Sequence, residues 1–227
     1  MNNSKLIDIY QLIESTRTSA PHAAEQVKLI AVSKTFPAER ILEIYNEGVR
    51  DFGENKVQEL VAKQKQLPSD IQWHMIGHLQ TNKVRQAVEH ATLIHSVDSM
   101  RILSRINTIA LQMNLVQDIL LQCNVTGEQS KSGFSIDDMD NAVTSLCDFP
   151  AVNCVGFMTM SAADQRSDEQ CATFAALRQL RDRIQAAHHM TLPELSMGMS
   201  ADFTNAIMEG ATQVRIGSAI FGTRDSQ

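Results

Sequence analysis

The first regular pattern of hydrophobic positions lies near the start of the chain. Leu6, Ile9, Tyr10 and Ile13 fall at i, i+3, i+4 and i+7, the spacing that places side chains on one face of an α-helix. We therefore predict an amphipathic helix over about residues 4–17, ahead of the other elements.

From residue 28 onward, short apolar runs alternate with stretches of helical periodicity. The short runs are apolar or β-branched and have the length of strands. We interpret eight of them as strands: KLIAVSK (28–34), VRDFGE (49–54), QWHMIGH (72–78), LIHSV (93–97), ILLQCNV (119–125), NCVGFMTM (153–160), ELSMGM (194–199) and QVRIG (213–217).

Alternation of strands and helices predicts parallel strands joined by right-handed crossovers. Eight such units favour a closed (β/α)8 barrel over about residues 28–223. The alternative at this point is an open, doubly wound sheet. No Pro-, Gly- or Ser-rich linker divides the chain, so we expect residues 1–227 to form a single domain.

Composition and charge narrow the possible partners. Of the 227 residues, 43% are hydrophobic and 20% charged, and the formal net charge is −6, which argues against a broad nucleic-acid-binding face. The four cysteines include no C-x-x-C pair, and we find no secretory signal or membrane-spanning run. We expect a cytoplasmic protein that binds neither nucleic acid nor membrane.

Polar residues follow the predicted strands where a barrel would place a site, at the C-terminal ends. Lys34 ends the first strand, Asn55 follows the second, and His78 ends the third. The segments MGMS (197–200) and RIGS (215–218) close the last two strands. The spacing of His74 and His78 would suit a metal only on a helix; on a strand these residues lie about 13 Å apart, so we expect no metal site.

The last two turns resemble a phosphate site. Ser200 is predicted to be the N-cap of a helix that ends near Gly210, and a helix N-terminus offers unpaired N–H groups to an anion. Gly217 would let the backbone approach that anion, and the Ser218 N–H can point at it. Turns after strands seven and eight are the usual phosphate position in this fold.

Lys34 then suggests the chemistry. A neutral lysine amine forms a Schiff base with a carbonyl compound, and an apolar pocket favours the neutral form. A phosphate, an aldehyde and such a lysine together describe pyridoxal 5′-phosphate. A Schiff-base aldolase that acts on sugar phosphates without a cofactor remains the other interpretation.

Several motifs resemble the pyridoxal-phosphate homeostasis protein family (the YggS/PROSC-like family), which is similar to the N-terminal barrel domain of alanine racemase. The motifs extend from about residue 28 to 223. Lys56 departs from the family pattern, in which this position is often aromatic, and this leaves any contact from position 56 in doubt. The matching stretches are AVSKT, FGENKVQE, WHMIGHLQTNK, NVTGEQSKSGF, GFMTM, LSMGMSADFTNAI and GATQVRIGSAIFG.

The resemblance implies a role for each candidate residue. Lys34 would carry the Schiff base, and Arg215 would face the pyridine nitrogen, where a permanent positive charge weakens carbanion stabilisation. Ser200, Gly217 and Ser218 would hold the phosphate, Asn55 and His78 would line the pocket, and Ile76, Met158 and Met199 would pack near the ring.

We expect a protein that holds pyridoxal phosphate in intracellular homeostasis, with no catalytic residues and little or no turnover. Alanine racemases carry a second domain that supplies a catalytic tyrosine, whereas this chain ends soon after the eighth strand and has only Tyr10 and Tyr45. The alternative is a racemase-like enzyme that uses pyridoxal phosphate. Apo-enzymes that use pyridoxal phosphate are the expected acceptors, and a monomer is the expected state.

Overall fold

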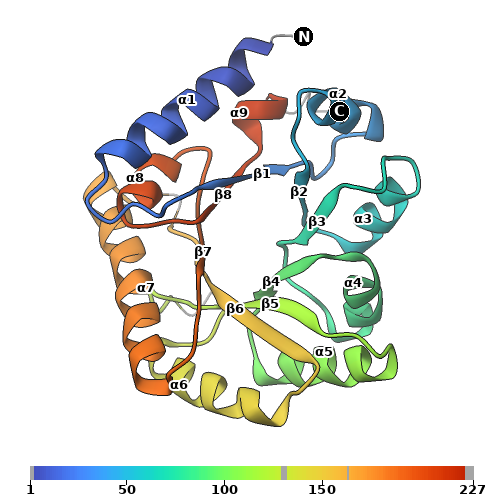
Figure 1. Cartoon of the computed structure of the whole chain (residues 1–227), viewed down its shortest axis with the longest axis vertical. Coiled ribbons are helices and arrows are strands. Elements are labelled where there is room, and N and C mark those ends of the chain that lie inside the picture. Colours follow the sequence, from blue (N-terminus) through green and yellow to red (C-terminus); the bar gives the residue numbers. More distant parts are fainter. Residues whose placement is uncertain (1–2, 129–131, 163, 223–227) are drawn as a thin grey trace.

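Eight parallel strands follow one another around a closed barrel, and the last of them pairs with the first. This computed structural model describes residues 3–128, 132–162 and 164–222. Figure 1 shows the helices arranged around the outside of the strands. The predicted (β/α)8 barrel with an additional N-terminal helix is therefore confirmed, and the open sheet is excluded.

The strands begin and end close to the predicted positions. They are β1 Lys28–Val32, β2 Asp51–Glu54, β3 Gln72–Met75, β4 Leu93–Val97, β5 Gln117–Gln122, β6 Val152–Met158, β7 Glu194–Met199 and β8 Gln213–Ile216. Five of them end one to three residues earlier than predicted, at Val32, Met75, Gln122, Met158 and Ile216. The candidate site residues therefore lie mainly in the turns that follow the strands.

Helices connect the strands and cover the barrel. They are α1 Asn3–Ser19, α2 Ala38–Asn46, α3 Val57–Gln64, α4 Val84–His90, α5 Met100–Gln112, α6 Ile136–Thr144, α7 Ser167–His188, α8 Phe203–Met208 and α9 Ser218–Phe221, with 3-10 turns η1 Thr81–Lys83 and η2 Ser145–Asp148. α1 packs beside α8 and α9. Its residues Leu6, Ile9 and Ile13 are buried, whereas Tyr10, predicted on the same face, is 43% exposed.

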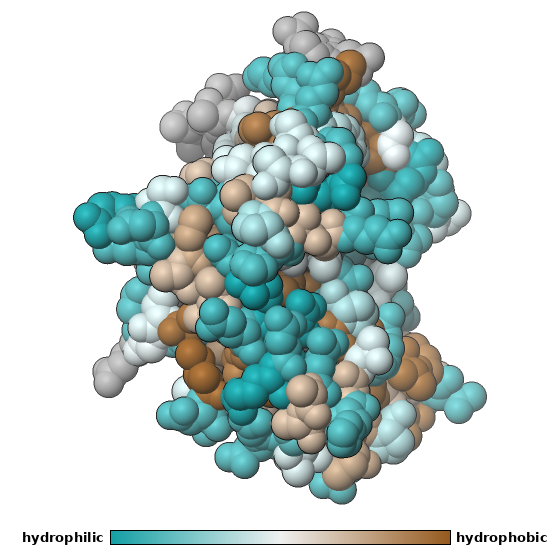
Figure 2. All heavy atoms as spheres, turned by 60° about the vertical axis from the view of Figure 1, so that its left-hand side comes forward, coloured by the Kyte–Doolittle hydropathy of each residue, from teal (hydrophilic) through white to brown (hydrophobic). Residues whose placement is uncertain are grey.

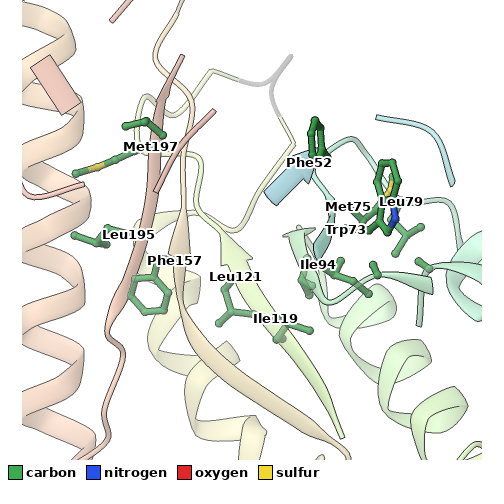
Figure 3. Close-up of a cluster of buried hydrophobic side chains, with 14 of the residues drawn as sticks. Phe52, Trp73, Met75, Leu79, Ile94, Ile119, Leu121, Phe157, Leu195 and Met197 are labelled. Carbon is green, nitrogen blue, oxygen red and sulfur yellow. The ribbon is translucent and has the colours of Figure 1, made fainter. Parts of the chain in front are cut away.

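The outward faces of the strands and the inner faces of the helices form the main hydrophobic core. Figure 3 shows part of this layer, with Phe52 on β2, Trp73 on β3, Ile94 on β4, Leu121 on β5, Phe157 on β6 and Met197 on β7. Because side chains alternate along a strand, their neighbours point into the barrel. There a small apolar group of Leu93, Leu120 and Met158 accompanies buried polar side chains, which are His74, His95, Ser196 and Arg215.

The surface that carries α1, α8 and α7 is largely polar. Figure 2 shows hydrophilic residues over most of this face and apolar residues only in small separate groups. Within the described part of the chain, no helix combines the length and the apolar character that crossing a bilayer requires.

Candidate functional site

One large cavity opens at the C-terminal end of the barrel. Its volume is about 860 Å³, within the range of small-molecule and cofactor sites. Turns after β1, β2, β3, β7 and β8 all contribute to its wall. Its wall includes most of the residues predicted at the cofactor site: Lys34, Asn55, His78, Met199, Ser200, Arg215, Gly217 and Ser218.

Lys34 continues the inward-facing row of β1. Ile30 and Val32 point into the barrel, and Lys34 follows at the same two-residue spacing, just past the end of the strand. Its side chain is half-buried, and its amine has no hydrogen bond or ion pair within the described residues. The amine is therefore available to a molecule in the cavity.

The turn that carries Lys34 is held in place from both sides. The Lys63 Nζ donates to the Ser33 carbonyl at 2.9 Å, and the Thr35 N–H donates to Glu59 Oε2 at 2.9 Å. Thr35 has φ of 70°, a conformation that a β-branched residue rarely adopts. The contacts on either side of Lys34 stabilise this strained turn and fix where the amine enters the cavity.

A buried ion pair supports the same turn. Lys63 Nζ lies 2.6 Å from Glu54 Oε1, and the Ser33 hydroxyl donates to the same oxygen at 2.7 Å. The Glu54 side chain is fully buried and that of Lys63 is 9% exposed. Burial raises the pKa of Glu54, and the contacts with Lys63 and Ser33 oppose that rise. The sequence interpretation missed this network, although Glu54 and Lys63 lie in and beside the FGENKVQE motif.

The turns after β7 and β8 meet at the cavity. The Gly217 N–H donates to Ser200 Oγ at 3.2 Å. A Cβ atom on Gly217 would lie 3.2 Å from the Val32 carbonyl oxygen, so this turn also packs closely against β1, two residues before Lys34. The hydroxyls of Ser200 and Ser218 donate to no acceptor within the described residues. These two turns, which we call the anion cradle, could therefore donate hydrogen bonds to an anion beside the Lys34 turn.

The prediction that Ser200 caps a helix is wrong. α8 begins at Phe203, and its N-cap residue is Asp202. The Asp202 carboxylate turns back toward the strands instead of capping the helix: it accepts from the Met199 N–H at 2.5 Å and from the Ser161 hydroxyl. Two residues of turn therefore separate Ser200 from the helix, and its hydroxyl faces the cavity and the Gly217 turn.

Arg215 brings a buried positive charge to the cavity wall. Its Nη1 donates to Ser196 Oγ at 2.6 Å and its Nη2 donates to the Thr159 carbonyl at 2.9 Å, and the residue is 4% exposed. Burial lowers the pKa of Arg215 to about 10. No carboxylate forms an ion pair with it within the described residues. The guanidinium remains protonated at neutral pH and can interact with a ligand.

The rim after β2 and β3 is formed by Asn55, Gly77 and His78. A Cβ atom on Gly77 would lie 2.3 Å from the Asn55 carbonyl oxygen, so the two turns pack together only because residue 77 is glycine. The His78 side chain is 56% exposed, and its Nδ1 lies 2.7 Å from Asp98 Oδ2. Asp98 was not singled out in the sequence analysis, although a carboxylate directly after the buried strand LIHSV is typical of a functional residue at a C-terminal strand end.

The remaining residues discussed in the sequence analysis lie partly inside and partly outside the cavity. Ile76 lines the cavity, but Met158 packs inside the barrel with Leu93 and Leu120. Lys56 is 72% exposed and pairs with Glu59 at 3.9 Å. His74 points away from His78 into the barrel interior, where it contacts His95. Residues 129–131 of the NVTGEQSKSGF motif lie outside the described residues.

The cavity also has lining residues that sequence reasoning did not single out. They include Phe36, which stacks on Phe221 with 5.0 Å between ring centroids, and Gln122, whose amide donates to the Ser132 carbonyl at 2.9 Å. Their positions follow from the closure of the barrel. Together with the amine, the anion cradle and the buried cation, they suit a small phosphorylated carbonyl compound with an apolar ring.

Comparison with known proteins gives a consistent family. The family model described as alanine racemase, N-terminal domain, matches residues 7–225. The chain is 39% identical to the pyridoxal phosphate homeostasis protein of Aquifex aeolicus over 221 residues, 97% of each chain. It is 35% identical to the protein of that name from Escherichia coli K12 over 226 residues, which are 97% of this chain and 95% of that one.

Solved structures agree with this assignment. PipY of Synechococcus elongatus, in the form with PLP bound, superimposes with a TM-score of 0.82 at 39% identity and covers 93% of this chain and 99% of its own. An alanine racemase of Clostridium difficile shares the fold alone, with a TM-score of 0.75 at 15% identity over 100% of this chain and 58% of that chain.

Proposed function

Because the chain belongs to the pyridoxal phosphate homeostasis protein family, we propose that it binds pyridoxal 5′-phosphate as a Schiff base on Lys34. We propose further that it acts in intracellular pyridoxal-phosphate homeostasis with little or no catalytic turnover. The observation that carries the proposal is that the same cavity is lined by the Lys34 amine, which has no partner among the described residues, by the anion cradle and by the buried Arg215.

The residues present fit the chemistry of this cofactor. The aldehyde requires an amine, which Lys34 supplies, and the phosphate requires donors, which Ser200 and the Gly217–Ser218 turn supply. We propose that the Arg215 guanidinium faces the pyridine nitrogen. Pyridoxal phosphate supplies an electrophilic carbonyl and an electron-withdrawing ring, and a neighbouring guanidinium disfavours protonation of the ring nitrogen. The ring is then a weaker electron sink than one that lies beside a carboxylate.

The surroundings of Lys34 support a low turnover. Racemisation needs a second acid–base group. Both tyrosines of the chain lie on outer helices, where they cannot supply it. Tyr10 is on α1, and the Tyr45 hydroxyl on α2 donates to Asp70 at 2.7 Å. Neither tyrosine lines the cavity. A racemase-like activity is the alternative, and the observation in its favour is the His78–Asp98 pair at the rim.

An exchangeable cofactor is part of the same proposal. The rim includes His78, with a side chain that is 56% exposed, and Met160, which is 39% exposed, so the cavity communicates with solvent. We propose that apo-enzymes that use pyridoxal phosphate are the acceptors and that the chain acts as a cytoplasmic monomer of 25.2 kDa. Loaded protein mixed with an apo-enzyme should restore that enzyme's activity; complete retention of the cofactor would contradict the transfer.

The central test is an absorbance spectrum of the full chain mixed with pyridoxal phosphate, followed by borohydride reduction and peptide mapping. We expect a visible band and a label on the peptide that contains Lys34, and loss of both in Lys34→Ala. Lys56→Ala is the matched control, because that lysine is exposed and outside the cavity wall, and it should behave as wild type. A carbonyl substrate trapped on reduction without any visible band would instead support the aldolase interpretation.

A further inference from the structure

A continuous chain of buried hydrogen bonds crosses the barrel interior and ends at the arginine of the cavity. Arg215 Nη1 lies 2.6 Å from Ser196 Oγ, and Ser196 Oγ lies 2.9 Å from His95 Nδ1. His95 Nε2 lies 2.9 Å from His74 Nδ1, and His74 Nε2 lies 2.9 Å from Asp51 Oδ1. Five strands, β8, β7, β4, β3 and β2, each contribute one of these residues.

Most of this hydrogen-bond chain is shielded from solvent. His95 and Ser196 are fully buried, and His74 is 2% exposed. Asp51 is the first residue of β2 and lines a second cavity of about 200 Å³ at the N-terminal end of the barrel. The chain therefore connects that end with the site that contains Lys34.

When both imidazoles are neutral, the hydrogen bonds from Arg215 to Asp51 can run in only one direction. A guanidinium can only donate, so Ser196 Oγ accepts from Arg215 and uses its own proton for His95 Nδ1. His95 then carries its proton on Nε2 and donates to His74 Nδ1. His74 in turn carries its proton on Nε2 and donates to the Asp51 carboxylate. A fixed cation stands at one end of this aligned chain and a carboxylate at the other.

A proton added at the N-terminal end of the barrel, which we call the lower end, would reverse some of the hydrogen bonds in this series. If His74 became an imidazolium, its Nδ1–H would point at His95 Nε2, and His95 would have to move its proton to Nδ1. Ser196 would then receive two donors and lose the acceptor for its own hydroxyl. The change would reach the atom that holds the Arg215 guanidinium.

Burial favours the neutral form of both histidines at neutral pH, and the charged groups around them act in both directions. Burial lowers the pKa of His74, although Asp51 opposes this, and burial with the nearby Arg215 holds the pKa of His95 well below its usual range. The other charged side chains at the lower end are Lys28 on β1, which lies 3.3 Å from Asp51, Asp118 on β5 and Glu194 on β7. Lys28 disfavours and Glu194 favours a proton on His74.

We propose that Asp51, His74, His95 and Ser196 are positioning residues for Arg215, and that they transmit the protonation state of the lower end of the barrel to the cofactor cavity. The hydrogen-bond geometry does not depend on which ligand the cavity binds. The effect on bound pyridoxal phosphate rests on the proposed function above.

The first test needs no cofactor. In ¹⁵N-labelled full-length protein at pH 7.5, long-range ¹H–¹⁵N spectra of the imidazole rings should show His74 and His95 both neutral and both protonated on Nε2. The variants His74→Gln and His95→Gln assign the signals. A proton on Nδ1 of either ring, or a cationic ring, would overturn the inferred direction of the chain.

The second test uses bound pyridoxal phosphate and follows its visible absorbance against pH. Asp51→Asn keeps the shape of the side chain and removes its charge, so we expect the pH midpoint to fall by about 0.5 pH unit, because a negative charge that favours protonated forms is lost. His188→Gln is the control: it removes a histidine–carboxylate contact with Asp140 on the outside of the barrel and should leave the midpoint unchanged.

Ser196→Ala distinguishes a relay from a simple electric field, because it interrupts the chain and leaves Asp51 charged. In this background Asp51→Asn should shift the midpoint by much less than in the wild-type background. An equal shift in both backgrounds, or no shift in either, would overturn the proposal. If wild-type protein shows no visible band at all, the proposed function fails, and the imidazole spectra alone decide whether the chain has the inferred direction.

Discussion

The Gly217 N–H donates to the Ser200 hydroxyl with 3.2 Å between nitrogen and oxygen, and this bond joins the turn after β8 to the turn after β7. Two segments that are each unremarkable in sequence become one anion cradle through this contact. Because β8 also pairs with β1, the cradle is fixed relative to the Lys34 turn.

Ser200→Ala should weaken the binding of pyridoxal phosphate about tenfold, since it removes a hydroxyl donor to a charged group and frees the Gly217 turn. The visible band at saturation should remain, because Lys34 is intact. Titration followed by absorbance measures the change. Ser104→Ala, at an exposed position on α5, should bind as wild type; equal affinities for both variants would argue against the cradle.

Lys63→Met should lower the free energy of unfolding by about 3 kcal/mol, because it leaves the buried Glu54 carboxylate without its cation. Urea unfolding measures this loss. Lys65→Met, an exposed neighbour, should cost less than about 0.5 kcal/mol. The double variant Glu54→Gln with Lys63→Met should recover part of the loss, whereas a simple sum of two losses would contradict the ion-pair account.

The protein loaded with pyridoxal phosphate should exchange the α-proton of alanine no faster than free pyridoxal phosphate does. The reason is that the cavity wall presents no tyrosine opposite Lys34. Proton NMR in D₂O measures the exchange. Exchange that is fast in wild type and lost in His78→Ala would favour the racemase-like alternative, with the His78–Asp98 pair as its acid–base group.

Stability should fall as the pH drops below about 6.5, the ordinary pKa of histidine. Burial lowers the pKa of His74 and His95 in the folded state, so the unfolded chain takes up protons first. The stability that these neutral rings contribute is fully present above pH 6.5 and is lost as the pH falls toward their folded-state pKa. Between pH 7.5 and 5.5 His95, whose pKa lies well below its usual range, should account for about 1 kcal/mol, and His74, where Asp51 opposes the shift, for less.

Urea unfolding at pH 7.5, 6.5 and 5.5 measures this loss. His188→Gln removes a partly exposed histidine on α7 and should preserve the decline. A wild-type protein that is equally stable at pH 7.5 and 5.5 would show that the buried rings do not stay neutral.

The order of elements and the location of the cavity followed from the sequence. Short apolar runs such as LIHSV and ELSMGM matched β4 and β7, and alternation with helices favoured a barrel whose site lies at the C-terminal strand ends. The residue motifs predicted which side chains would line that cavity, from Lys34 after the first strand to Ser218 after the last. These features depend on local periodicity and on covalent order, which a sequence records directly.

Tertiary structure alone decided which polar groups meet. Ser200 is not the helix N-cap that the sequence predicted, because α8 begins at Phe203, and the Asp202 carboxylate accepts from Met199 and Ser161 instead. Lys63 contacts Glu54 and Ser33, and His74 contacts His95, none of which was predicted from the sequence. Such contacts join residues that are distant in the chain, and they depend on how the strands are paired and staggered around the barrel. No local pattern encodes that stagger, because it results from the closure of all eight strands together.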